Sequence, residues 1–228
     1  MVFEDRREAG RVLGELVAVL PDIADGVVLG LVRGGVPVAY EVAKACRLPL
    51  DILVVRKLGV PRQEELAMGA IASGGGVVLN EHVLRGYRVS EKELEHVIKR
   101  EMQEMERREK LYRDGQPAME IDGRAVILVD DGLATGASMR AAIQAVKGRA
   151  RRVIVAVPVG ARSTCEELAQ EADQVVCAMM PEPLDAVSLF YREFGATSDE
   201  EVTALMRDEE RKDIWTRDGG GTSGGECL

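Results

Sequence analysis

The stretch VILVDDGLATGAS, residues 126–138, gives the clearest indication of how this chain folds. Apolar residues up to Val129 predict a buried strand, which carries two adjacent carboxylates, Asp130 and Asp131, at its carboxyl end. Small and hydroxyl residues follow, and from 137 onward apolar residues at helical spacing predict a helix. Because α/β folds bind ligands at the carboxyl ends of their strands, we expect the acidic pair to lie at a ligand-binding edge.

The segment between the acidic pair and the helix has the composition of an anion site. It consists of small and hydroxyl residues, namely Ala134, Thr135, Gly136, Ala137 and Ser138. Backbone N–H groups at a helix N-terminus bind phosphate, and small side chains let the phosphate approach closely. Two neighbouring carboxylates would repel a bare anion. They suit the hydroxyls of a phosphorylated sugar, or a metal that bridges to further phosphate.

Other phosphate-binding and acidic motifs do not match. A Walker A loop needs Gly-Lys-Ser/Thr, but Gly136 is followed by Ala137. The first predicted strand lacks the GxGxxG pattern of a dinucleotide site. A receiver domain would carry its acidic pair at an N-terminal strand and a further Asp at a later strand end, whereas Asp173 precedes a strand.

Short apolar runs rich in Val and Ile recur along the chain, and strands and helices are predicted to alternate. The predicted buried strands are 27–32, 52–55, 77–79, 125–129, 153–157 and 175–178. Helices are predicted near 12–20, from 36, and over 137–149, 163–172 and 199–212. This alternation predicts an α/β fold with a mostly parallel sheet flanked by helices.

A further helix is predicted over 90–113, where Ser90 and Glu93 form a capping box. It is highly charged and has a narrow apolar stripe. One interpretation is a helix that docks a partner protein. We favour the other, an exposed helix that rests one face on the sheet, because runs of mixed charge are usually solvated.

Composition excludes several classes of protein. The 39 acidic and 30 basic residues give a net charge of −9, which argues against a nucleic-acid or anionic-membrane binder. No apolar run approaches the roughly 18 residues of a membrane span. The four cysteines have no CxxC spacing, so neither a zinc site nor a disulfide scaffold is expected, and we expect a cytoplasmic protein. Arg6 and Arg7 are interpreted as a solvated helix start and not as an export signal.

The stretch at 126–138 resembles the 5-phosphoribosyl 1-diphosphate (PRPP) motif of type I phosphoribosyltransferases. That motif is an apolar strand, two acids, three variable residues, Thr-Gly, and a small or hydroxyl residue. Asp130, Asp131, Thr135, Gly136 and Ser138 match its defining positions.

Two further segments resemble parts of the same family. Residues 29–37, LGLVRGGVP, resemble its pyrophosphate loop, which implies a role for Arg33, Gly34 and Gly35 and a cis peptide at Arg33–Gly34. Residues 54–70, VVRKLGVPRQEELAMGA, follow the next strand. There the resemblance implies that Arg56 and Lys57 lie near the diphosphate, and that Gly59–Glu65 is a mobile lid carrying Arg62.

The resemblance extends to about residue 205 and implies one phosphoribosyltransferase-like domain over 1–210. Its core would span about 1–178. A small C-terminal hood over about 179–198 would cover the acceptor, and a C-terminal helix would follow over about 199–212. The Gly-rich residues 213–228 cannot bury apolar surface, so a disordered tail is expected.

Three residues are candidates for contact with the acceptor. The resemblance places Phe190 and Tyr191 in the hood, where they would either stack on a ring or pack within the hood itself. Arg162 follows a late strand, at a place where purine enzymes of the family use a lysine. The order of motifs is similar to a subgroup of the family whose acceptor is unassigned.

The resemblance implies a Mg²⁺-dependent transferase that moves the 5-phosphoribosyl group of PRPP to a small-molecule, nucleobase-like nitrogen acceptor and releases pyrophosphate. Asp130, Asp131, Lys57 and Arg62 would be its catalytic residues, with the two aspartates also holding Mg²⁺, directly or through water. No nucleic-acid or membrane partner is expected, and a homodimer is left open. Two alternatives are a PRPP-sensing regulator without catalysis and an accessory domain that binds a partner protein.

Overall fold

The computed structural model describes residues 2–208 and has a five-stranded parallel sheet at its centre. The strand order is β2-β1-β6-β7-β8, and every neighbouring pair is parallel. These strands are β1 (Val27–Leu31), β2 (Leu50–Leu53), β6 (Ala125–Val129), β7 (Arg152–Val159) and β8 (Gln174–Met179). The predicted α/β class is confirmed. The run predicted as one strand over 52–55 is divided, because Val55 begins a strand of another sheet.

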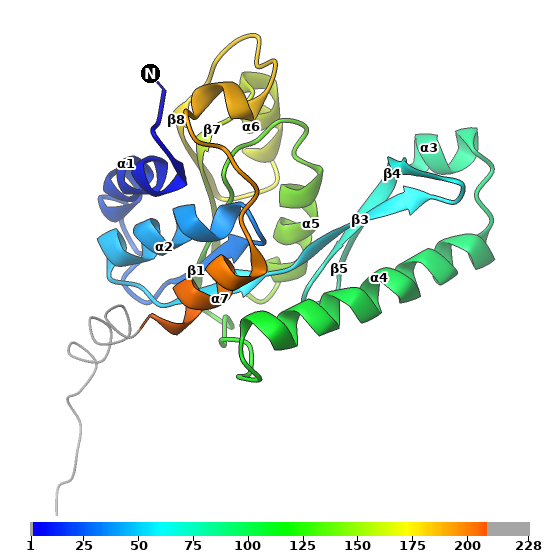
Figure 1. Ribbon diagram of the computed structural model, residues 1–228, viewed down its shortest axis with the longest axis horizontal. Helices are drawn as coiled ribbons and strands as arrows, with labels where there is room; N and C mark the ends of the chain where they lie inside the picture. Colours follow the sequence, from blue (N-terminus) through cyan, green and yellow to red (C-terminus); the bar gives the residue numbers. More distant parts are fainter. Residues whose placement is uncertain (1, 209–228) are drawn as a thin grey trace, which may run out of the picture.

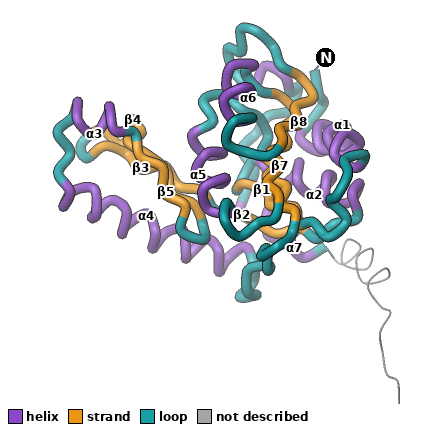
Figure 2. The backbone as a smooth tube through the Cα atoms, turned by 180° about the vertical axis from the view of Figure 1, so that it is seen from behind, coloured by secondary structure: helices purple, strands orange, loops and turns teal. Residues whose placement is uncertain are grey.

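Helices cover both faces of this sheet (Figure 1). They are α1 (Arg6–Ala18), α2 (Gly35–Cys46), α5 (Ala137–Val146) and α6 (Arg162–Leu168). Successive residues of β6 point to opposite faces, as a strand requires. Ile127 and Val129 therefore join the core beneath α1 and α2, whereas Val126 and Leu128 join the core beneath α5 and α6. Figure 2 shows the same two layers from behind.

Residues 55–112 form an arm that projects from the main sheet (Figure 1). It contains a three-stranded antiparallel sheet in the order β3-β4-β5 and two helices. The elements are β3 (Val55–Val60), β4 (Gln63–Ala72), β5 (Gly76–Leu79), α3 (Glu81–Gly86) and α4 (Glu91–Tyr112). The strand predicted at 77–79 is thus real but lies in an antiparallel sheet. Gly74 and Gly75, with φ of 86° and 96°, form a tight turn that folds β5 back onto β4.

The prediction of a loop over Gly59–Glu65 is wrong, because this segment is the end of a β-hairpin. Gly59 and Val60 end β3, a turn containing Arg62 (φ 69°) follows, and β4 begins at Gln63. The cause is apolar burial that the segment's charged composition conceals. Leu58 and Val60 are buried in the core that α4 covers, so the two strands stay paired up to the turn.

The exposed-helix interpretation of residues 90–113 is confirmed, with the arm's own sheet as the surface beneath. Ser90 and Glu93 form the capping box at the start of α4. Val97 and Met105 are buried in the core, whereas Met102 on another face is exposed. Docking of a partner protein on the exposed face stays a prediction.

The hood contacts the beginning of the chain. Its single 3₁₀ turn among the described residues is η1 (Val187–Phe190), and the next residue, Tyr191, forms a bridge with Phe3. The backbone N–H of Phe3 donates to the carbonyl of Phe190 at 2.9 Å, and that of Arg192 donates to the carbonyl of Phe3 at 2.9 Å. The N-terminal segment and the hood therefore form one packed unit.

The C-terminal helix is α7 (Asp199–Arg207), which packs against α2 and α4. The predicted extension of this helix to 212 and the predicted tail at 213–228 lie outside the described residues. Within residues 2–208, the helices are too short or too polar to cross a membrane.

Packing beneath α4 predicts unequal costs for two leucine truncations in the arm. Leu58 is 0% exposed and Leu111 is 42% exposed. Leu58→Ala should lower the free energy of unfolding by about 2–5 kcal/mol, since it removes buried contacts and leaves a cavity. Leu111→Ala, the matched control, should cost less than about 1 kcal/mol. Urea unfolding followed by circular dichroism measures both, and equal costs would contradict the burial of Leu58.

Candidate functional site

The acidic pair lies where the loops after β6 and β1 meet. Because β1 and β6 are parallel neighbours, both strands end at the same edge of the sheet. The carboxylates of Asp130 and Asp131 lie against the loop that follows β1. A Cβ built on Gly34 would overlap Oδ2 of Asp131, and one built on Gly35 would lie 3.1 Å from Oδ1 of Asp130. Glycine is therefore needed at both positions for the two loops to approach.

Burial makes the acidic pair electrostatically costly. Desolvation raises the pKa of Asp130 well above its ordinary value of 3.8, and the neighbouring Asp131 raises it further. Desolvation also raises the pKa of Asp131, although the charge of Arg6 opposes this shift. A ligand that supplies positive charge or hydroxyl donors to these carboxylates would offset the cost.

The predicted anion loop lies beside the pair and leads into α5. Gly136 is the N-cap of α5 at φ 74°, a conformation that favours glycine, and no side chain of residues 2–208 caps this helix. The loop is held through its carbonyl groups. Thr164 Oγ1 donates to the carbonyl of Ala134 at 2.7 Å, and Arg140 Nη1 donates to that of Thr135 at 3.0 Å. The first N–H groups of α5 consequently remain available to an anion.

The loop after β1 contains a cis peptide bond, but it joins Val32 to Arg33. The prediction of a cis bond at Arg33–Gly34 is therefore wrong by one residue, although the cis bond lies in the predicted loop. The half-exposed side chain of Arg33 forms an ion pair with Asp199 at 3.5 Å. Asp199 in turn accepts a hydrogen bond from the Tyr112 hydroxyl at 2.6 Å.

The sequence suggested that Arg56 and Lys57 lie at the carboxyl end of a parallel strand. This is wrong. The parallel strand β2 ends at Leu53, and both cations belong to β3 of the arm. Arg56 Nη2 forms an ion pair with the buried Glu101 at 2.6 Å, and Lys57 Nζ lies 3.5 Å from a carboxylate oxygen of Glu65. In this conformation, both charges face glutamates of the arm.

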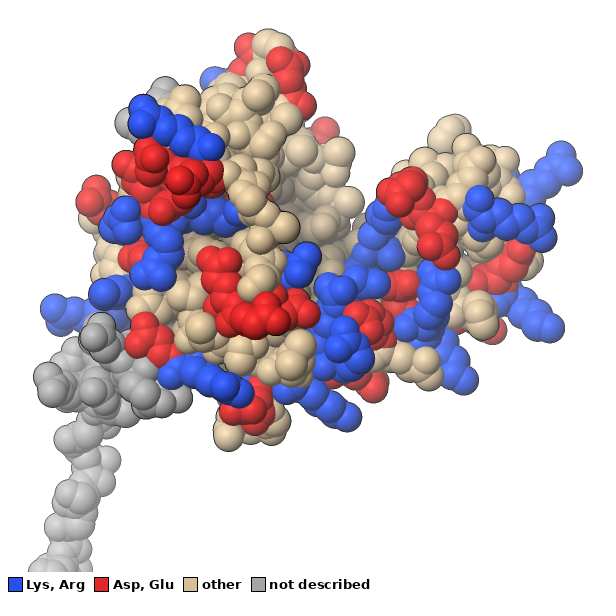
Figure 3. Space-filling model, in the orientation of Figure 1, with Lys and Arg blue, Asp and Glu red and all other residues tan. Residues whose placement is uncertain are grey.

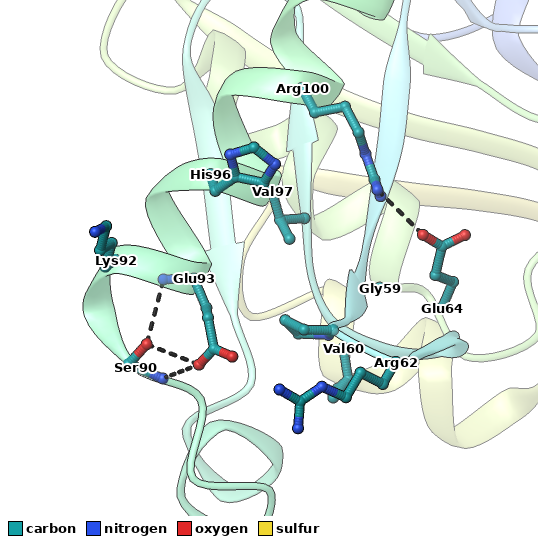
Figure 4. Close-up of a pocket in the computed structure, with 11 residues that line it drawn as sticks. Gly59, Val60, Arg62, Glu64, Ser90, Lys92, Glu93, His96, Val97 and Arg100 are labelled. Carbon is teal, nitrogen blue, oxygen red and sulfur yellow. Dashed lines mark hydrogen bonds and ion pairs between the residues drawn. The ribbon is translucent and has the colours of Figure 1, made fainter.

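Arg62 lines a cavity of about 440 Å³ between the hairpin turn and the start of α4 (Figure 4). Its charge lowers the pKa of Glu93, although hydrogen bonds from Ser90 are the larger cause of that shift. Basic and acidic side chains alternate over the face of the arm that Figure 3 shows. The structure thus brings together Arg33, Gly34, Gly35, the acidic pair and residues 134–138, and it places Arg56, Lys57 and Arg62 on the arm.

The candidate acceptor residues have partners within the hood region. Tyr191 is buried, donates its hydroxyl to the carbonyl of Asp131 at 2.6 Å and stacks on Phe194 at 4.8 Å between ring centroids. For Tyr191 the geometry thus matches packing within the hood. Phe190 is half-buried, and Arg162 forms an ion pair with Glu182 at 3.3 Å.

The sequence interpretation missed Arg6, which is not a solvated residue. Its side chain is 12% exposed, and its Nε and Nη2 each lie 2.8 Å from Oδ2 of Asp131. The position of Arg6 at the start of the helix was a signal that its side chain has a specific partner. The first turn of a helix favours acidic residues, so an arginine there is out of place unless it has a distant partner.

Comparisons with known proteins agree with this geometry. The family model described as the phosphoribosyl transferase domain matches residues 20–182. Two proteins from Mycobacterium tuberculosis strains CDC 1551 and H37Rv, which carry provisional phosphoribosyl transferase names, are each 46% identical over 206 residues, or 90% of this chain. The chain spans 46% of the length of these relatives. The crystal structure of TT1426 from Thermus thermophilus is similar with a TM-score of 0.76 and 43% identity, covering 90% of this chain and 98% of that one.

The raised pKa of Asp130 predicts how an amide at this position changes stability with pH. A carboxyl group that binds its proton more tightly when folded reduces stability as the pH rises above its unfolded pKa, near 3.8. Asp130→Asn should therefore raise the Tm of the ligand-free protein by at least about 2 °C at pH 7.5. The increase should shrink as the pH falls and approach zero only below the unfolded pKa, at about pH 3, where the carboxyl is protonated in both states.

Thermal unfolding between about pH 3 and 8 tests this prediction, with the exposed Asp185→Asn as the control. The control should change the Tm little at any pH. A lower Tm for Asp130→Asn at pH 7.5 would show that Asp130 supports the fold, contrary to the electrostatic argument.

Proposed function

This chain belongs to the phosphoribosyl transferase family, and we propose that it binds PRPP and transfers its phosphoribosyl group to a nitrogen acceptor. The observation that carries the proposal is the meeting of an acidic pair, an uncapped helix N-terminus and a glycine loop at one sheet edge. These three parts match the three chemical groups of PRPP, which are a ribose, a 5-phosphate and a diphosphate.

The loop at 134–138 is proposed to bind the 5-phosphate. The N–H groups in the first turn of α5 would donate to the phosphate oxygens, and the positive end of the helix dipole would favour its charge. The hydroxyls of Thr135 and Ser138 provide further donors. Ala134 and Ala137 leave space for close approach, since both are exposed and have small side chains.

Asp130 and Asp131 are proposed to bind the ribose 2- and 3-hydroxyls. Ionised carboxylates only accept hydrogen bonds, and a cis-diol offers two donors side by side. The pair is half-buried, so hydrogen bonds from a ligand are strengthened by the lower local dielectric. The 3₁₀ turn of the hood packs against the residue that follows the pair, because a Cβ on Gly132 would overlap Val187.

Magnesium is proposed to bind with PRPP. Residues 2–208 contain no cluster of three or more side chains of the kinds that ligate metals, but Mg²⁺ commonly uses one or two carboxylates and completes its shell with water and substrate phosphates. The oxygen ligands of Asp130 and Asp131 fit that requirement. When bound, Mg²⁺ would stabilise the negative charge that develops on the leaving pyrophosphate.

Transfer requires the acceptor nitrogen to bond to C1 of the ribose while the bond from C1 to the pyrophosphate oxygen breaks, with inversion at C1 and loss of a proton from the acceptor. The protein would contribute position and electrostatics rather than a nucleophile. Gly34 and Gly35 let the diphosphate approach the backbone, and Arg33 would exchange Asp199 for a phosphate oxygen. Lys57 and Arg62, with Arg56, are proposed to reach the diphosphate when the arm moves toward the sheet edge.

The acceptor is proposed to enter between the hood and the acidic pair. Phe190 and Arg162 are the candidates to contact it. Tyr191 would instead support Asp131 from behind, through the hydrogen bond of its hydroxyl to the Asp131 carbonyl. A planar, nucleobase-like ring suits the aromatic character of the hood.

We expect PRPP with Mg²⁺ to raise the Tm, because a ligand that binds only the folded state stabilises it by about 2.7 kcal/mol at one hundred times its Kd. Asp130→Asn combined with Asp131→Asn should abolish the increase, whereas Asp185→Asn should keep it. A flat Tm at millimolar PRPP, in folded wild-type protein, would contradict the proposal. Pyrophosphate release from PRPP with pooled nucleobases and amines then separates a transferase from a protein that only binds PRPP.

Because Gly34 lies against Asp131, adding a methyl group at Gly34 tests whether this contact belongs to the PRPP site. Gly34→Ala should lower PRPP affinity about tenfold or more, because the new Cβ must displace a carboxylate oxygen. Gly86→Ala is the matched control, since a Cβ on Gly86 meets no atom of the described part of the chain within 4 Å. Calorimetric titration with PRPP and Mg²⁺ measures both variants, and equal affinities would remove Gly34 from the site.

A further inference from the structure

Arg6 is held by three groups at the point where the N-terminal segment, the hood and the acidic pair meet. Its Nε and Nη2 lie 2.8 Å from Oδ2 of Asp131, and its Nη1 donates to the carbonyl of Gly195 at 2.7 Å. The guanidinium also lies 4.0 Å from the centroid of the Phe194 ring. These contacts hold the guanidinium at all three of its nitrogens and on one face.

The location of Arg6 is unfavourable for a residue that only supports helix α1. A cation in the first turn opposes the positive end of the helix dipole. The next residue, Arg7, shows how an arginine in this turn can serve helix packing alone. Arg7 is 41% exposed, forms an ion pair with Glu41 at 2.6 Å and lies over the Tyr40 ring at 4.5 Å, all away from the acidic pair.

Asp131 is fixed on several sides. Its Oδ2 lies between the guanidinium of Arg6 and the backbone of Gly34, and its carbonyl accepts the Tyr191 hydroxyl. Among the described residues, the hydrogen bonds between residues engage Oδ2 of Asp131 and Oδ1 of Asp130. One oxygen of each carboxylate is therefore left for a ligand.

We propose that Arg6 is a positioning residue of the phosphoribosyl site, which fixes the Asp131 carboxylate so that the acidic pair presents its remaining oxygens to the ribose hydroxyls. Arg6 does not touch the reacting atoms. It acts through Asp131, and the hood acts through Arg6, since Gly195 and Phe194 hold the guanidinium in place. This inference rests on the proposed function.

The effect of removing Arg6 should depend on whether the ligand has ribose hydroxyls. Arg6→Gln should weaken PRPP binding with Mg²⁺ by about tenfold or more, comparable to the loss of one charge-assisted hydrogen bond. Binding of inorganic pyrophosphate with Mg²⁺ should weaken by a smaller factor, because that ligand has no diol and would meet Asp131 only through the metal. Arg6→Lys keeps the charge but not the fork of donors, so it should recover part of the PRPP affinity.

Two further variants separate positioning from stability. Arg7→Gln loses a buried partner and a ring contact in the same helical turn, and it should leave PRPP affinity unchanged. Phe194→Leu removes the ring beneath the guanidinium without altering any charge, and it should weaken PRPP by a smaller factor than Arg6→Gln. This variant also provides the test if Arg6→Gln fails to fold.

Calorimetric titration of the full chain with PRPP and with pyrophosphate, each with Mg²⁺, measures these affinities. Selective loss of PRPP affinity in Arg6→Gln and Phe194→Leu supports the proposal. Equal loss for both ligands, or wild-type PRPP affinity in both variants, overturns it. If the wild-type protein itself binds no PRPP, the proposed function fails first, and the role of Arg6 fails with it.

Discussion

The half-buried pair of carboxylates at the end of β6 is the constraint on which the site depends. Desolvation raises the pKa of both acids, and the charge of Asp131 raises the pKa of Asp130 further. Arg6 offsets part of this cost through its contact with Oδ2 of Asp131. The oxygens that face the loop after β1, Oδ2 of Asp131 and Oδ1 of Asp130, are the ones that accept hydrogen bonds between described residues, so the other oxygen of each acid is left uncompensated. A folded protein retains such a cost where function requires it, which is why this edge, and not a larger cavity elsewhere, carries the functional argument.

The rest of the main domain holds that edge in place. Alternate residues of β6 are anchored in the two cores, so the strand cannot slide by one residue without exchanging its faces. Parallel pairing with β1 then brings the glycine loop to the same height as the acids. Helix α5 begins directly after the anion loop, and Thr164 and Arg140 hold the loop by its carbonyl groups. Rigid elements thus position every part of the proposed PRPP site except the cations of the arm.

The cations of the arm, unlike the residues at the sheet edge, are not held at the proposed site. Its sheet is covered on one side by α4, and two of the cations proposed for the site are paired with glutamates, Arg56 with Glu101 and Lys57 with Glu65. Such pairs lower the cost of keeping cations without a ligand, and a diphosphate with Mg²⁺ would compete for them. The hairpin is nevertheless a folded structure with a buried Leu58, so approach to the site would require movement of the arm as a unit rather than ordering of a loop.

The amino-acid order was enough to predict the alternation of strands and helices, the acids at the end of β6, the loop of small residues that leads into α5, and the capped helix at 90–113. Each depends on neighbours in the chain, through the periods of strand and helix and the geometry of a cap. Long-range packing was needed to establish that β5 pairs antiparallel with β4, that Arg56 faces Glu101, and that Arg6 reaches Asp131 from 125 positions away. Local sequence sets the direction in which a side chain leaves the backbone. The partner it finds depends on which distant elements hydrophobic packing brings together, and no local pattern contains that information.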